Sequence, residues 1–243
     1  MDTLQYANPN IIGRIVAADF RKAEVFKRAG IDFCCGGNKT VQQACDEKGI
    51  DAGWLLAQLV KVDGEPLLPS LDYRSWGLSF LCDYIVNTHH RYVLDTLPDL
   101  LGYTAKIAVV HGQHHPELPE VAHLFAAVDK ELRQHLAKEE SVLFPAIKAL
   151  EEGDKAVAVI IGTEIARINE EHEFAGSTLN QINHLTGGYQ VPDDACNTYR
   201  VALQLLKQFE DDLHLHVHLE NNILFPAAVA KAQSGQILRS EVS

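Results

Sequence analysis

Hydrophobic side chains recur every three to four residues through the first quarter of the chain, which is the period of an amphipathic helix. The period is clearest over residues 10–30, where it predicts a single helix with Gly30 as its C-terminal stop. Its apolar positions are Ile12, Ile15, Val16, Phe20, Ala23 and Phe26. Two shorter helices, near 40–47 and 51–62, complete what we expect to be a small helical domain.

The stretch DGEPLLPSLDY, residues 63–73, interrupts this pattern. It contains two prolines, a glycine and three acidic residues, a composition typical of a linker. We therefore expect two domains, over residues 1–65 and 74–232.

Beyond the linker the helical period continues to the end of the second domain, without a convincing alternation of apolar and polar residues. Turn signals divide this region into four long segments, and short connections between long helices favour an up-down-up-down arrangement. The expected segments are 75–111, 117–149, 156–185 and 195–232. The sequence thus predicts an all-α protein, a four-helix bundle preceded by a small helical domain.

Composition narrows the class of protein. Hydrophobic residues make up 47% of the 243 residues, enough for a packed core, and the net charge is −12. An acidic surface disfavours binding to nucleic acid or to an anionic membrane, and no apolar run is long enough to span a bilayer. The N-terminus lacks the features of a signal peptide, and five cysteines are a poor disulfide framework, so we expect a cytoplasmic protein.

An internal repeat lies within the predicted bundle. The segment from His135 to Ala146 matches the segment from His216 to Ala227 at six of twelve positions. Both contain H-x-x-x-E followed by L-F-P, as His135–Glu139 and His216–Glu220. The two halves of the bundle therefore look like related helical hairpins.

The repeated H-x-x-x-E pairs are candidate metal ligands. Residues four apart share one face of a helix, and imidazole with carboxylate suits iron, zinc or manganese. In antiparallel helices, two residues lie at the same level when they are equally far from the turn that joins the helices. The residues level with the midpoint of His135 and Glu139 are then His90 on the first helix, His172 on the third and the region of His216 on the fourth. Each of the four helices is thus expected to place a histidine at one level of the bundle.

Four histidines and two glutamates are too many ligands for one zinc ion but suit two metal ions. Two bridging carboxylates and two histidines for each ion leave room for an oxo or hydroxo bridge and an open position. Metal ions paired in this way lie roughly 3.5–4 Å apart. Ferritin-type sites use Glu-x-x-His motifs and more carboxylates, so this pattern is the more histidine-rich one.

The motif pattern resembles the hemerythrin-like di-iron bundles. The segment Ile31-Asp-Phe-Cys-Cys-Gly-Gly37 resembles the ScdA-type N-terminal domain of the Repair of Iron Centres family. Together the two resemblances cover about residues 8–230. They imply two non-haem iron ions, with His90, His135, His172 and His216 as terminal ligands and Glu139 and Glu220 as bridging carboxylates. Classical oxygen carriers have a fifth histidine and an aspartate in the last helix, where this chain has Glu220.

The resemblance implies repair of iron–sulfur clusters damaged by nitrosative or oxidative stress, with the di-iron site as the source of iron. Damaged iron–sulfur proteins would be the clients and NO or O2 the small ligands. It also suggests a homodimer formed through the N-terminal domain. Two alternatives stay open at this stage: a di-iron nitric oxide reductase, and a hemerythrin-like sensor of oxygen or NO.

Other polar residues have weaker expectations. Cys34 and Cys35 are adjacent and precede two glycines, and we interpret them as a loop dithiol that takes NO, exchanges disulfides or transfers iron. Glu131 and Glu171 lie where they could orient a ligand histidine or line an iron or proton path.

The remaining histidines and cysteines are expected to have structural roles. Neighbouring residues on a helix differ in direction by about 100°, so His89 should point away from the core if His90 points into it. For the same reason Glu140, which follows Glu139, should not lie on the helix face of His135. His214 and His218 are expected either to face solvent or to support the metal-binding residues without binding the metal themselves. Turn roles are expected for His111, His114 and His115, and packing roles for Cys45, Cys82 and Cys196.

Overall fold

The computed structural model describes residues 10–63 and 72–240, with side chains as far as residue 234. In these two ranges the regular elements are helices, and the one β contact is an isolated bridge between Ile11 and Thr40. The all-α expectation is confirmed. Among the described residues, no helix combines the length and hydrophobicity needed to cross a membrane.

The single helix expected over residues 10–30 is wrong, because the chain breaks at Asp19. Helix α1 (Ile12–Ala18) ends there, and a short 3-10 turn, η2 (Phe20–Lys22), leads into α2 (Ala23–Arg28). Asp19 has extended backbone angles, and its carboxylate accepts a hydrogen bond from the Arg21 N–H, which begins a new helical turn. The expected stop is correct, since Gly30 has a φ of 65°.

The two shorter helices of the N-terminal domain are confirmed as α3 (Val41–Lys48) and α4 (Ala52–Asp63). Thr40 caps α3 in a capping box with Gln43, which satisfies backbone N–H groups at the helix start. Most of the predicted linker, residues 64–71, lies outside the described residues.

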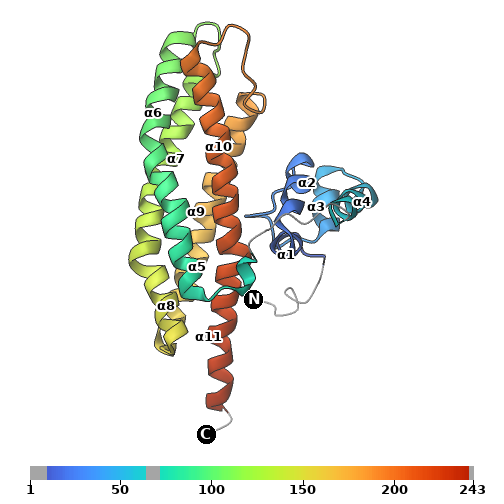
Figure 1. The fold of residues 1–243 in the computed structure, drawn as a ribbon, viewed down its shortest axis with the longest axis vertical. Coiled ribbons are helices and arrows are strands. Elements are labelled where there is room, and N and C mark those ends of the chain that lie inside the picture. The colour runs from blue at the N-terminus through green and yellow to red at the C-terminus, as the bar shows by residue number, and fades with distance from the viewer. Residues whose placement is uncertain (1–9, 64–71, 241–243) are drawn as a thin grey trace.

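The second part of the chain forms a four-helix bundle (Figure 1). Its long helices pack in a closed order, α6 on α7, α7 on α9, α9 on α10 and α10 on α6, as an up-down-up-down bundle requires. Its helices are α5 (Leu78–Ile85), α6 (Arg91–His111), α7 (Leu118–Lys138), α8 (Phe144–Glu152), α9 (Ala158–Leu185), α10 (Asn197–Leu219) and α11 (Phe225–Ser240).

Three of the four bundle segments contain a five-residue π-helical stretch. These are η4 (Val86–His90) between α5 and α6, η5 (Glu139–Leu143) between α7 and α8, and η7 (Glu220–Leu224) between α10 and α11. Each stretch begins or ends at one of the candidate ligands. Single π turns inside α-helices occur frequently at functional sites, where they change the direction of side chains.

The apolar core of the bundle is divided by a polar layer. On α7 and η5, Leu136 belongs to one apolar cluster and Leu143 to the other, with Glu139 between them. On α9, His172 lies in the same way between Ile168 and Ala175. Burying such polar side chains costs free energy unless they are paired or bind a ligand, so this layer is the place to seek a site.

The N-terminal domain packs beside α10 and η7 (Figure 1). His218 of α10 contacts the rings of Phe20 and Phe33, with ring centroids 5.6 and 6.0 Å away. Asn222 donates hydrogen bonds from its side-chain amide to the backbone oxygen of Phe33, and Lys27 pairs with Asp211. The loop that contains Cys34 and Cys35 is thereby held against the side of the bundle at the level of the polar layer.

Candidate metal centre

The structure brings the six predicted metal ligands together in the polar layer. His90 comes from η4, His135 and Glu139 from the junction of α7 with η5, His172 from α9, and His216 and Glu220 from the junction of α10 with η7. Their exposed fractions are between 0% and 2%. They form two sets of four, each with atoms within 4.8 Å of one another: His90, Glu139, His216 and Glu220, and His135, Glu139, His172 and Glu220.

The two glutamates belong to both sets, which is the geometry of bridging ligands. Glu139 Oε2 lies 3.4 Å from His90 Nε2 and 3.2 Å from His135 Nε2. Glu220 Oε2 lies 3.1 Å from His172 Nε2, and its Oε1 lies 3.1 Å from His216 Nε2. Each histidine therefore turns its Nε2 atom toward a shared carboxylate.

Several of these atoms make no hydrogen bond although they are completely buried. They include both carboxylate oxygens of Glu139, Oε2 of Glu220 and Nε2 of His90. Nε2 of His135 also faces Nε2 of His172 at 3.2 Å, a contact in which at most one atom can donate. Unpaired buried atoms of this kind are costly, and their common direction fits a group of cations held by nitrogen and oxygen.

The charges of the layer favour a cation. Burial tends to lower the pKa of His135, but the neighbouring Glu139, Glu171 and Glu220 carboxylates raise it to about 10. Burial likewise opposes ionisation of Glu139 and Glu220, yet the surrounding histidines hold the pKa of both carboxyls below their ordinary value. Protons on the imidazoles thus balance two buried negative charges, and metal ions could replace those protons.

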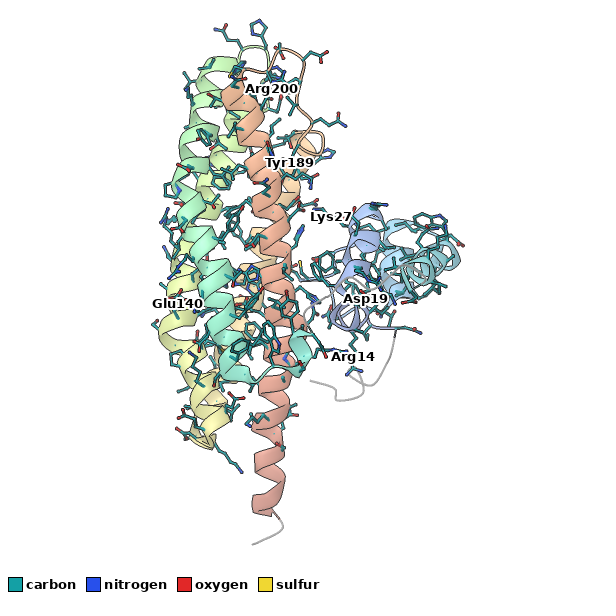
Figure 2. All side chains as sticks on the ribbon, in the orientation of Figure 1. Arg14, Asp19, Lys27, Glu140, Tyr189 and Arg200 are labelled. Atoms are coloured by element: carbon teal, nitrogen blue, oxygen red, sulfur yellow. The ribbon has the colours of Figure 1, made fainter. Side chains whose placement is uncertain are left out.

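Three of the four histidines are held from behind through Nδ1. Glu140 Oε1 lies 2.8 Å from His90 Nδ1, Glu171 Oε2 lies 2.9 Å from His135 Nδ1, and Asn221 Oδ1 lies 3.0 Å from His172 Nδ1. Metal-bound histidines usually donate their second N–H in this way, which fixes the ring and raises its basicity. Figure 2 shows Glu140 on the outer side of the bundle.

Sequence reasoning found only Glu171 of these three supporting residues. The phase of Glu140 relative to His135 predicts no role in the site, but its carboxylate reaches His90 on another segment. The sequence pattern does not predict the role of Asn221, although this residue directly follows Glu220. Glu131 is only half-buried on α7 and makes no hydrogen bond or ion pair with a candidate ligand in the described part of the chain.

His89 and His218 differ from expectation because both are buried, with 1% of each residue exposed. The π turn at η4 has i to i+5 hydrogen bonds, and this wider turn allows His89 and His90 to face inward together. His89 Nδ1 lies 3.0 Å from Asp212 Oδ1. His218 faces the N-terminal domain, and burial lowers its pKa to about 4, so it is a neutral packing residue rather than a solvated one.

The loop dithiol lies at the contact between the N-terminal domain and the bundle. The Sγ atoms of Cys34 and Cys35 are 4.0 Å apart and both thiols are free. Asp32 accepts hydrogen bonds from the backbone N–H groups of Cys34, Cys35 and Gly36. The neighbouring Cys35 thiol, burial and Asp32 raise the pKa of Cys34, which keeps it protonated, whereas Cys35 is the more accessible thiol.

One pocket lies between the dithiol and the side of the bundle. It has a volume of about 1040 Å³ and is lined by Cys34, Cys35 and Asp32 on one side and by residues of α9 and η7 on the other. Asn221, the partner of His172, also lines it. Cys35 approaches α9 closely, because its Sγ lies 3.5 Å from the position that a Cβ would occupy on Gly176.

The histidines at the first turn of the bundle lie apart from the polar layer. His115 contacts Glu117 and Asp194, as a turn residue would. His111 Nε2 lies 3.1 Å from the Sγ of Cys196, which is exposed at the start of α10. The packing role expected for Cys196 is therefore wrong, while Cys45 and Cys82 are buried as expected.

Comparison with protein families gives two matches that together cover most of the chain. Residues 8–63 match the ScdA_N family, described as a domain of unknown function (DUF542). Residues 83–228 match the family described as the hemerythrin HHE cation-binding domain. The second match contains all six residues of the polar layer named above.

Curated relatives match over nearly their whole length. The iron-sulfur cluster repair protein ScdA of Staphylococcus epidermidis is 32% identical over 217 residues, covering 89% of this chain and 96% of the relative. The iron-sulfur cluster repair protein YtfE of Pectobacterium atrosepticum is 33% identical over 218 residues, covering 90% and 96%. YtfE of Yersinia pestis is 34% identical over 227 residues, covering 93% and 99%. The chain therefore belongs to the Repair of Iron Centres family, in which a ScdA-type domain precedes a hemerythrin-like cation-binding domain.

Proposed function

We propose that this protein repairs iron–sulfur clusters damaged by nitrosative or oxidative stress, and that it does so by supplying iron from a non-haem di-iron centre. The observation that carries the proposal is the pair of buried four-residue sets that share Glu139 and Glu220. The relatives named as iron-sulfur cluster repair proteins support it. None of the relatives reported above is named as a nitric oxide reductase or a sensor.

In this proposal each residue of the layer has a defined role. His90 and His216 would hold one iron ion and His135 and His172 the other, and the carboxylates of Glu139 and Glu220 would be shared by both. Bound iron would supply one-electron redox chemistry and a store of metal. Glu140, Glu171 and Asn221 keep three of the imidazole rings in place.

Release of iron would follow from reduction. A ferrous ion carries less charge than a ferric ion and is held less tightly by carboxylate oxygens. The pocket that joins Asn221 to the dithiol offers an exit, in which Cys35 is the accessible thiol and Cys34 stays protonated. The client clusters, NO or O2 as ligands, and a homodimer stay predictions.

The first test is the metal content and electronic spectrum of anaerobically purified protein. Wild type should hold two iron ions per chain with an oxo-bridged ferric absorption band, and His135→Ala and Glu220→Ala should lose both. The matched control is His184→Ala, which changes an exposed histidine of α9 and should retain the iron. One zinc ion per chain, or full iron in the two ligand variants, would contradict the proposed centre.

The second test concerns iron transfer. Iron-loaded protein is reduced in the presence of a [4Fe–4S] protein whose cluster has lost iron by oxidation, and recovery of the cluster absorption is followed. We expect faster recovery than with the unreduced protein. Iron that survives both reduction and a ferrous chelator would exclude the donor role while leaving the di-iron centre intact.

A further inference from the structure

A row of aromatic rings leads from the surface of the bundle to His216. The ring centroids of Trp76 and Tyr84 are 5.0 Å apart, those of Tyr84 and His89 are 5.7 Å apart, and those of His89 and His216 are 5.7 Å apart. Phe80, of which 58% is exposed, lies 4.9 Å from Trp76 at the outer end. Consecutive rings are thus in contact from solvent to a candidate ligand.

The π turn is what makes this row continuous. Phe80 and Tyr84 are four residues apart and share one face of α5, and Trp76 lies just before that helix. The next step, from Tyr84 to His89, is five residues and runs into η4, whose hydrogen bonds span five residues. The same turn therefore places His90 among the candidate ligands and His89 at the end of the aromatic row.

His89 is a buried histidine whose ring lies between those of Tyr84 and His216. It is 1% exposed, its Nδ1 atom is held by Asp212, and its Nε2 atom makes no hydrogen bond. Its ring lies nearly parallel to that of His216, at 9°. His216 is also the one candidate ligand whose Nδ1 atom has no hydrogen-bond partner among the described residues. The other three candidate histidines have a carboxylate or an amide at Nδ1, whereas His216 has the His89 ring as a neighbour.

We propose that Trp76, Tyr84 and His89 form a route that carries single oxidising equivalents from the candidate metal centre to the protein surface. Electron tunnelling weakens exponentially with distance, so rings in contact divide one long step into short ones. Tyrosine and tryptophan give up an electron only to strong oxidants, and the proposed source of these oxidants lies at the inner end, so the oxidising equivalent would travel outward. The inference rests on the proposed iron site, since iron that meets a hydroperoxide is a source of such oxidants.

The electron balance of the route is simple. Hydrogen peroxide accepts two electrons and two protons to give two water molecules. If iron held in the polar layer supplied only one of these electrons, with a proton from water, Tyr84 would supply the other electron together with its phenolic proton. Trp76 then returns an electron and its indole proton to Tyr84. A small thiol in solution restores Trp76 with one electron and one proton, and two such thiols form one disulfide. The histidine ligands and the buried thiol of Cys82 are thereby spared.

The metal-free protein tests the route independently of iron. The chain contains two tryptophans, so a Trp54→Phe background leaves Trp76 alone. Azide radicals generated by pulse radiolysis remove one electron from the indole, which loses its proton to water, and become azide. We expect the indole radical to decay into a tyrosyl radical at a rate independent of protein concentration. This conversion runs opposite to the outward direction and measures how readily the two rings exchange an electron. When Tyr73 is also replaced by Phe, adding Tyr84→Phe should slow this conversion by an order of magnitude, whereas the control Tyr103→Phe should not.

Tyr73 is the competing electron donor to the indole radical, because its ring lies 4.9 Å from that of Trp76. If Tyr73→Phe abolishes the conversion and Tyr84→Phe leaves it unchanged, the proposed route is overturned. Absence of any conversion in the Trp54→Phe background would overturn it as well. These outcomes do not depend on whether the protein binds iron.

Iron-loaded protein tests the function of the route. After limited hydrogen peroxide without thiol, peptide mapping should find oxidation at Trp76 in excess of that at Trp54, although Trp54 is 50% exposed. In Tyr84→Leu the modification of Trp76 should fall several-fold and that of the buried histidines should rise. Equal oxidation of the two tryptophans, with or without iron, would overturn the proposal. Failure to load iron would instead count against the proposed function, and the metal-free experiment would still decide the route.

Discussion

Glu171 holds the Nδ1 atom of His135 at 2.9 Å, while the Nε2 atom of the same ring faces Glu139 at 3.2 Å. The hydrogen bond to His135 is the main reason that the pKa of Glu171 falls to about 2, with Lys138 and Arg167 adding to the effect. His135 thus connects a carboxylate outside the layer with one inside it. The position of an imidazole and its basicity are set together by such an arrangement.

We expect Glu171→Gln to weaken metal binding without preventing it. The amide oxygen can still accept the Nδ1 hydrogen, but the negative charge that raises the basicity of His135 is lost. Changes to partners of this kind typically cost roughly 10–100-fold in metal affinity. Anaerobic competition with a ferrous chelator measures the effect. Glu173→Gln, two residues along on an exposed position of α9, is the control and should bind as wild type does.

Metal binding should release protons. In the metal-free protein His135 has a pKa of about 10, and the pKa of His90 is also raised, by Glu139, Glu220 and Glu140 against the effect of burial. Because folding raises the pKa of His135, this group stabilises the metal-free fold fully at pH values below the ordinary pKa of a histidine. That contribution is lost as the pH rises through about 10. A metal ion needs the neutral imidazole, so affinity should rise about tenfold per pH unit for each proton displaced.

Calorimetry in buffers of different ionisation enthalpy measures this release directly. The observed heat at neutral pH should vary with the buffer, and the slope gives the number of protons. An affinity for ferrous ion that is constant across the neutral range would show that His135 and His90 are already neutral.

The contact between the two domains should depend on the fit of Asn222 against Gly13. A Cβ on Gly13 would lie 2.0 Å from Oδ1 of Asn222 and 3.0 Å from the backbone oxygen of Gly37. Asn222 itself joins His218 to the backbone of Phe33. Asn222→Ala leaves these groups unpaired and should lower the free energy of unfolding by about 1–3 kcal/mol.

A double-mutant cycle separates the clash from the hydrogen bonds. Gly13→Ala should destabilise the wild type more than it destabilises the Asn222→Ala protein, because the second change removes the atom that the new methyl group meets. Chemical denaturation gives the four free energies of unfolding of the cycle, and Asn180→Ala on the exposed side of α9 is the control. Additive effects would mean that Gly13 and Asn222 do not share this contact.

Much of the bundle is readable from sequence because its signals are local and periodic. The positions of the turns, together with the spacing of His135 and Glu139, predict which residues of the other helices lie beside this pair. Helix geometry in this way identifies His90 and His172. Asp19 shows the limit of the method. Apolar spacing on its two sides is continuous with one helix, and only the capping contact with Arg21 reveals the break.

Features that depend on contact between helices could not be read in this way. Glu140 supports a histidine on another segment, so its phase relative to His135 carries no information about its role. His89 is inward only because η4 is a π turn, which a 3.6-residue period does not anticipate. The same turn conceals the aromatic row, since the step from Tyr84 to His89 does not match an α-helical face.

Cys196, which is exposed at the start of α10 and lies away from the polar layer, should be a reactive thiol. The contact with His111 is the main cause that lowers its pKa to about 7, helped by the backbone N–H groups of Tyr199 and Thr198 at the start of α10. Because the thiolate is the nucleophile, alkylation by iodoacetamide should rise with pH to a midpoint near 7. In His111→Ala the midpoint should move up toward about 8.5, the ordinary value of a free thiol. Rates for the peptide that contains Cys196, read by mass spectrometry, test this, with His114→Ala as the control in the same turn. Identical pH profiles in the wild type and His111→Ala would show that the helix start alone activates the thiol.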